Sequence, residues 1–194
     1  MKHFFQFLIF LAVCNKINAT SALMVDGQPP TANGQRPTAN DQQPTANDQQ
    51  PTDTSLTINR NAFYKAVQSE NKELVNAQLT ELTSVTPKNT QDAFLGTMTM
   101  KKAGLGGSPV TKLHLFKVGH KLLETAILQE PNNVEFRFLR LMIQENAPGI
   151  LGYKSNEEKD CELIRKSYKS LPPDLQHVIA DYNKKSKVLK LEVS

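Results

Sequence analysis

Two arginines in an apolar stretch are the side chains of this sequence best suited to binding an anion. Arg137 and Arg140, together with Gln144, follow helical spacing within a run rich in phenylalanine and leucine. A guanidinium on such a face needs a carboxylate or carbonyl partner, and Glu124 and Glu135 are near enough in the chain to supply one. Two interpretations stay open: a paired network that fixes helix packing, or a bidentate clamp for a ligand's carboxylate or phosphate.

The remaining reactive side chains fit structural roles better than catalytic ones. Cys161 falls on an apolar helical stripe, so we expect it to pack as a small apolar group, and no activating base can be assigned to it. His120 with Glu124 and His177 with Asp181 could each place two metal ligands on one helical face. Because His120 lies on an apolar stripe, a packed histidine is favoured. We expect no catalytic residue, no metal and no cofactor.

The glycine-rich segment 104–108 lacks the sequence of a nucleotide-binding loop. It has neither the Gly-Lys-Ser/Thr of a P-loop nor the third glycine of a dinucleotide fingerprint. Lys101 and Lys102 suit the carboxyl end of one helix, and Gly104 suits the left-handed residue after it. Ser108 and Pro109 suit the start of the next helix. We interpret the segment as a helix stop followed by a helix start.

Apolar spacing predicts an all-α fold with about seven helices and no strand. We expect a single helical domain over 56–194, built from antiparallel helical hairpins because the connections are short. Ser155 and Glu158 predict a capping box, and the most apolar helix, 134–146, should lie at the centre. The expected helices cover about 59–68, from 71 to a break at Pro87 and Asn89, 91–102, 109–130, 134–146, from 155 to about 170, and 173–187.

The amino end reads as a targeting segment followed by a tether. A basic start, a short apolar run and small residues predict a signal peptide over 1–22. Leu11-Ala12-Val13-Cys14 resembles the box before the lipidated cysteine of bacterial lipoproteins, so lipidation at Cys14 is the alternative. In 23–55, Pro-Thr-Ala-Asn recurs every seven residues without a large apolar position. This composition predicts a disordered linker rich in Pro, Thr, Asn and Gln.

The net charge of the chain bears on which classes of partner it could bind. The chain has 194 residues, 23 of them Lys or Arg and 19 Asp or Glu, for a net charge of +4. Loss of Lys2 and Lys16 with a leader leaves about +2, so the basic balance gives no argument for nucleic acid. No second long apolar run follows, so we expect no transmembrane segment after processing.

A lysine-rich tail ends the sequence. We interpret it as a solvated helix end or as a weak contact with an anionic membrane surface or polymer. The tail contains Lys184, Lys185, Lys187 and Lys190, interleaved with Val188, Leu189 and Leu191.

Two resemblances bear on the fold. The pattern Gly119-x3-Leu123-x2-Ala126-x4-Pro131 resembles the second helix of a tetratricopeptide repeat, in which small residues let two helices approach. The first helix of such a unit would fall across 104–109, which cannot be helical, so the resemblance is to part of one unit. The run 135–148, with 101–105 upstream, resembles uncharacterised exported all-helical proteins of Bacteroidota-type bacteria. That second resemblance implies an envelope location and no particular activity.

These features favour an exported, non-enzymatic interaction module of the periplasm or cell surface. The module would present a helical groove to a protein or peptide partner, and a low-complexity tether would precede it in the chain. The first alternative is a lipid-anchored structural protein of the envelope. The second is an enzyme with a helical fold, which would need a pocket that unites Arg137 or Arg140 with several carboxylates and a histidine.

Overall fold

A computed structural model describes residues 58–192, and their secondary structure is helical without a strand. This confirms the all-α class and the expected seven α-helices for that part of the chain. The predicted leader and linker, with Cys14, lie outside the described residues. The helices are α1 (Arg60–Gln68), α2 (Lys72–Glu81), α3 (Lys88–Gly104), α4 (Pro109–Gln129), α5 (Val134–Asn146), α6 (Glu157–Ser167) and α7 (Pro173–Asn183).

Side-chain caps fix where four of these helices begin. In each case an oxygen of the residue before the helix accepts a hydrogen bond from a backbone N–H of the first turn, which would otherwise lack a partner. Pro109 follows the capping serine of α4, as expected. The capping residues are Asn59 for α1, Asn71 for α2, Ser108 for α4 and Asn133 for α5.

Three predicted boundaries are wrong. Helix α3 begins at Lys88, and Asn89 does not break it; the Asn89 amide donates instead to the carbonyl of Ala126 near the end of α4, at 3.4 Å. The capping box of α6 does not form, because Asn156 precedes the helix without a side-chain capping bond and Glu158 accepts from Arg165 instead. Helix α7 ends at Asn183, four residues early.

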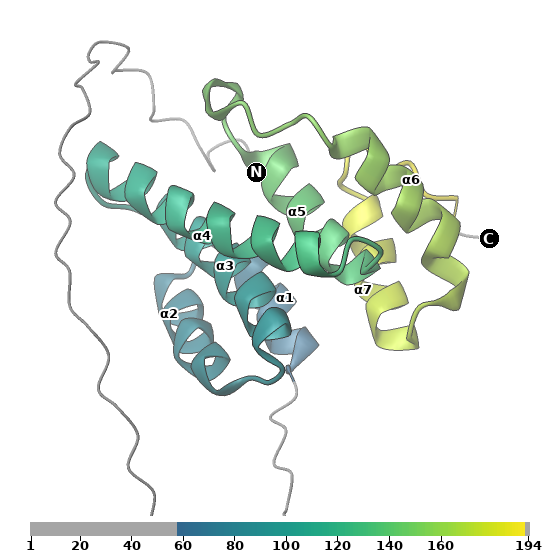
Figure 1. Cartoon of the computed structure of the whole chain (residues 1–194), viewed down its shortest axis with the longest axis horizontal. Helices are drawn as coiled ribbons and strands as arrows, with labels where there is room; N and C mark the ends of the chain where they lie inside the picture. The colour runs from purple at the N-terminus through teal and green to yellow at the C-terminus, as the bar shows by residue number, and fades with distance from the viewer. Residues whose placement is uncertain (1–57, 193–194) are drawn as a thin grey trace, which may run out of the picture. The chain divides into compact units, whose positions relative to one another are not determined.

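Helices α3 and α4 form the longest antiparallel hairpin, as Figure 1 shows. They touch through two glycines. A Cβ added to Gly96 would lie 2.6 Å from the carbonyl oxygen of Gly119, and one added to Gly119 would lie 2.7 Å from Cγ of Met100. Gly119, which the tetratricopeptide-like pattern predicted at a contact between two helices, therefore does lie at such a contact. The hairpins are compatible with a tetratricopeptide-like arrangement, and the repeat itself stays a prediction.

Helix α5 lies at the centre of the described residues, as its composition predicted. It contacts α3, α4 and α6, and Figure 1 shows it between the α3–α4 pair and α6. Because it is enclosed on these sides, both apolar and polar residues of α5 are buried. The buried members are Glu135, Phe136, Phe138, Leu139, Arg140, Leu141, Met142, Ile143 and Gln144.

The lysine-rich tail is not a solvated helix end. After α7 the chain continues without regular structure, and Leu189 and Leu191 are buried in the core. One carboxylate secures this segment: Glu145 of α5 accepts hydrogen bonds from the Tyr182 hydroxyl, the Ser186 hydroxyl and the backbone N–H of Lys187, all between 2.7 and 2.9 Å. None of the helices between residues 58 and 192 has the length and apolar character that crossing a bilayer demands.

Candidate functional site

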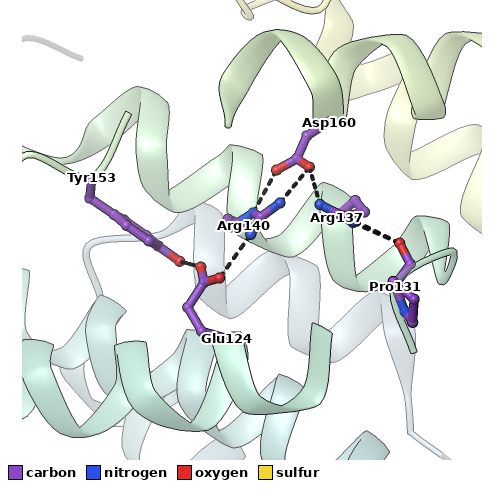
Figure 2. A network of polar contacts seen from close by, with 6 residues as sticks. All are labelled: Glu124, Pro131, Arg137, Arg140, Tyr153 and Asp160. Atoms are coloured by element: carbon purple, nitrogen blue, oxygen red, sulfur yellow. Dashed lines mark hydrogen bonds and ion pairs between the residues drawn. The ribbon is translucent and has the colours of Figure 1, made fainter. Parts of the chain in front are cut away.

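The predicted arginines meet carboxylates from two other parts of the fold, as Figure 2 shows. Arg140 donates from Nε and Nη2 to the two oxygens of Asp160 on α6, both at 2.7 Å. Its third nitrogen, Nη1, donates to Glu124 on α4 at 2.8 Å. Tyr153, in the connection before α6, donates its hydroxyl to the other oxygen of Glu124 at 2.5 Å. The guanidinium therefore joins α4, α5 and α6.

Arg137 extends the same cluster toward the start of α5. Its Nη1 donates to Asp160 at 3.0 Å, and its Nε and Nη2 donate to the carbonyl of Pro131. We call Glu124, Arg137, Arg140, Tyr153 and Asp160 the arginine network. Asp160, Arg140 and Tyr153 are its buried members, at 0%, 3% and 7% exposure.

One predicted partner is wrong. Glu124 does pair with Arg140, but Glu135 turns the other way and pairs with Arg60 of α1, at 2.8 and 2.9 Å. Tyr64 also donates its hydroxyl to Glu135, at 3.1 Å. The place expected of Glu135 is taken by Asp160. The sequence does contain a signal for the burial of Asp160. This residue lies next to Cys161 and four positions before Ile164, and both of these residues are buried on α6.

Burial and charge tune the ionisable groups of the network. Burial lowers the pKa of Arg140, but the hydrogen bond and charge of Asp160, with the charge of Glu124, more than offset it, so this pKa is raised. Burial first, and then the Glu124 carboxylate, raise the pKa of Tyr153 far above its ordinary value. The arginine stays charged and the tyrosine stays a hydrogen-bond donor. The network is thus a fixed set of charge-assisted bonds.

Gln144, the third predicted site residue, does not join the arginine network. It is 0% exposed, and neither its side-chain nitrogen nor its side-chain oxygen has a hydrogen-bond partner among the described residues. A buried amide without partners costs about 1–3 kcal/mol. The structure therefore separates Gln144 from the two arginines that precede it on α5. Ligand binding by Arg137 and Arg140 would have to displace Asp160, Glu124 or Pro131, and it stays a prediction.

The other singled-out residues occupy structural positions. Cys161 is buried, and burial raises the pKa of its thiol to about 11. His120 packs edge-on against the Tyr153 ring, with ring centroids 4.6 Å apart, which places a histidine beside the network. His177 lies on the exposed side of α7, with Nε2 3.3 Å from the carboxylate of Asp181. Between residues 58 and 192, no three His, Cys, Asp or Glu side chains form a metal-holding group.

The glycine-rich segment is a helix stop and start, as expected, with one shift. Helix α3 includes Gly104, and the left-handed backbone falls on Gly106 and Gly107, at φ 152° and 102°. These angles strongly favour glycine, because a Cβ would clash with the backbone.

A groove that the sequence did not predict lies along α1 and the carboxyl end of α7. It consists of two adjoining cavities, which share Gln68 and Lys185 in their walls. The smaller has a volume of about 400 Å³ and the larger about 530 Å³. We call the pair the lysine groove, because its lysines outnumber its carboxylates. Its charged residues are Lys65, Lys101, Lys184, Lys185, Lys187, Glu70, Glu145 and Asp181, with His177 beside them.

The wall of the larger cavity contains a buried lysine. Lys101 of α3 is 2% exposed, and burial lowers its pKa to about 8, while the charge of Glu70 acts in the opposite direction. Apolar side chains of α1 and α5, among them Val67, Met142 and Ile143, complete this wall. Sequence reasoning missed Lys101 by treating it as a helix-end charge. Its spacing from Phe94 and Met98, seven and three residues earlier, places it on the buried face of α3.

Comparisons with family models, curated proteins and solved structures find no match to this chain.

Proposed function

We propose that this chain is an exported, non-enzymatic interaction module of the cell envelope, and that the lysine groove accepts a segment of a protein or peptide partner. The observation that carries the proposal is the groove itself. Its two cavities lie within the volume range of ligand sites in proteins, and it combines apolar walls with a few convergent charges. Neither cavity is lined by Arg137, Arg140 or Glu124, so the groove leaves the arginine network intact.

Site-specific photo-crosslinking in the native envelope tests this proposal. A Gln68→p-benzoylphenylalanine variant places the photoreactive group in the wall that both cavities share. A Thr125→p-benzoylphenylalanine variant places the same group on the exposed side of α4. We expect a crosslinked species from the Gln68 position and none of that mass from the Thr125 position.

A charge-reversal variant tests whether the crosslink depends on the groove. Lys185→Glu, combined with the photoreactive group at Gln68, should lower the yield about fivefold or more, because Lys185 lies in both cavities. Lys121→Glu, an exposed lysine of α4, is the matched control and should leave the yield unchanged. Equal crosslinking from both positions, or a yield indifferent to Lys185→Glu, would count against the groove as the interaction site.

Location and anchoring are tested separately. Mass spectrometry of the mature amino end should find a chain that begins after Ala19 or Ala22 if the leader is removed as a signal peptide. The alternative, a lipid-anchored envelope protein, is favoured by the residues before Cys14 and predicts a diacylglyceryl group on that cysteine. In that case globomycin would block maturation. An unprocessed amino end would contradict both.

Contact with an anionic membrane surface would depend on charge alone. Lys184, Lys185, Lys187 and Lys190 are exposed, whereas Leu189 and Leu191 are buried. A purely electrostatic contact of this kind weakens steeply with salt. Vesicle co-sedimentation at low and high ionic strength measures it.

A further inference from the structure

The smaller cavity of the lysine groove is bordered by polar faces of two helices. Three of its lining residues belong to α1 and are spaced four and three positions apart. Three more belong to the last turns of α7 and its C-cap, with the same spacing. Residues spaced in this way share one face of a helix. The two sets are Asn61, Lys65 and Gln68 on α1, and His177, Asp181 and Lys184 on α7.

The charges around the smaller cavity do not balance. Its wall has three lysines, Lys65, Lys184 and Lys185, and one carboxylate, that of Asp181. Lys184 donates to this carboxylate at 2.8 Å, and Nε2 of His177 lies 3.3 Å from its other oxygen. Lys65 and Lys185 form no ion pair with any residue between 58 and 192. Two ammonium groups from distant parts of the chain therefore border the cavity without a carboxylate in contact with them.

This arrangement favours a carboxylate as the group that enters. Clustered cations attract an anion, and two ammonium groups can each donate to one oxygen of the same carboxylate. The buried side chains of the wall are Tyr64 and Val178. The Tyr64 hydroxyl is already donated to Glu135, at 3.1 Å. This part of the wall therefore suits the methylene stem of an acidic side chain better than a second charged group.

The larger cavity determines what can follow the acidic side chain. It shares Gln68 and Lys185 with the smaller cavity, and its wall includes the apolar side chains of Val67 and Met142. One carboxylate fills only a small part of these two volumes, whereas a short extended peptide spans both. In an extended chain, side chains two positions apart point to the same face, about 6.5 Å from each other.

We propose that the smaller cavity binds an acidic side chain of the partner, with its carboxylate between Lys65 and Lys185. In the same extended segment, an apolar side chain two positions away enters the larger cavity and contacts Val67 and Met142. The inference rests on the proposed function and specifies the chemistry of the partner at the same groove.

Three matched peptides test the inference on the full chain. The acidic probe is acetyl-Ala-Glu-Ala-Leu-Ala-amide, and the neutral probe replaces its glutamate with glutamine. The reordered probe, acetyl-Ala-Glu-Leu-Ala-Ala-amide, keeps composition and charge but directs the two side chains to opposite faces. We expect the acidic probe to bind about tenfold more tightly than the neutral one and about threefold more tightly than the reordered one. Backbone amide chemical shifts measure the affinities and should change at α1 and at the end of α7.

Variants test whether the lysines read the carboxylate. Lys65→Gln should weaken the acidic probe about fivefold and leave the neutral probe unchanged, because it removes only a partner of the carboxylate. Lys121→Gln on α4 is the matched control and should change neither affinity. Both lysines are exposed, so neither substitution removes a buried contact. A loss of affinity for the acidic and the neutral probe alike would assign Lys65 a structural role and overturn the inference.

Other outcomes separate the inference from its premise. Equal affinities of the acidic and neutral probes, while the crosslink at Gln68 still depends on Lys185, overturn the inference and leave the proposed function standing. Equal affinities of the acidic and reordered probes overturn the extended placement across two cavities. Inorganic phosphate that binds as tightly as the acidic probe, or phosphatidylglycerol vesicles that displace it, would assign the lysines to another class of anion. Absence of a crosslink at Gln68 overturns the proposed function itself.

Discussion

Arg140 and Lys101 are both buried cations, yet their surroundings differ in kind. Three nitrogens of Arg140 donate hydrogen bonds to two carboxylates of the same chain, those of Asp160 and Glu124. Lys101 lies in the wall of a cavity beside two exposed lysines. A planar guanidinium can satisfy several fixed acceptors at once, which suits a joint between helices. An ammonium is a compact point charge that shifts its pKa readily when it is buried.

The comparison predicts opposite effects of removing charge in the two regions. Taking a carboxylate from the arginine network should destabilise the fold severely, because a buried charge is left behind. Taking the charge from Lys101 should instead make the fold more stable. The following predictions test or refine this contrast.

The largest effect is expected for Asp160→Ala. The variant leaves Arg140 buried with one carboxylate and removes the only side-chain partner that Arg137 has between residues 58 and 192. We therefore expect a loss of about 3–5 kcal/mol in the free energy of unfolding. Urea denaturation measures it. Glu158→Ala is the matched control on the same helix, since Glu158 is largely exposed, and should change stability by about 0.5 kcal/mol or less. A small effect of Asp160→Ala would refute the structural assignment of the network.

The next effect concerns Lys101→Met and has the opposite sign. The folded pKa of Lys101 is about 8, below its ordinary 10.5. Between these values the unfolded chain holds the proton more tightly, so wild-type stability should rise with pH across that window. The variant should be about 2–3 kcal/mol more stable at neutral pH, with the difference vanishing near the upper end of the window. Urea denaturation measures the stability difference between the two proteins. A difference of the same size at neutral pH and near pH 10.5 would contradict the buried-cation account.

A third prediction concerns the hairpin that carries both regions, since α3 bears Lys101 and α4 bears Glu124. Gly96→Ala would place a Cβ 2.6 Å from the carbonyl oxygen of Gly119, and the backbones must separate to admit it. We expect a loss of about 1–3 kcal/mol. Gly149→Ala, where no atom lies within 4 Å of the added Cβ, should be close to neutral. Similar melting temperatures for the two variants would argue against the close helix contact.

The smallest effect is expected for Gln144→Met. Because neither polar atom of Gln144 has a partner in the described part of the chain, the near-isosteric methionine should raise stability by about 1 kcal/mol. Gln78→Met is the matched control: Gln78 is also buried, but its amide donates to Glu81 at 2.7 Å. That variant should lose stability by a similar amount. Thermal unfolding measures the stability change of each variant, and two changes of the same sign would refute the prediction.

The fold could be predicted from the sequence further than the site could. Helix spacing and capping residues are local, and they predicted seven helices, the start of α4 and both ends of α5. The errors arose where tertiary contacts override local signals: Asn89 bonds to the end of α4, and the segment after α7 bonds to Glu145 rather than continuing as a helix.

The candidate sites depend on residues far apart in the chain. Asp160 could be paired with Arg140 only once α5 and α6 lay side by side, because it is 20 residues away in sequence and Glu135 is much nearer. The lysine groove joins α1 to residues more than one hundred positions later. No periodicity within one helix reports such a cavity. The one usable signal was Lys101 itself, a charge in register with Phe94 and Met98.

The way Glu145 holds the end of the described chain has a consequence for how this surface can evolve. At position 187 the donor to Glu145 is the backbone N–H, so any residue except proline preserves the attachment. The side chains there are interchangeable as far as folding is concerned, while the loop that displays them keeps its path. Substitutions along this edge can therefore change the charge and shape of the exposed surface, and the hydrophobic interior beneath need not change.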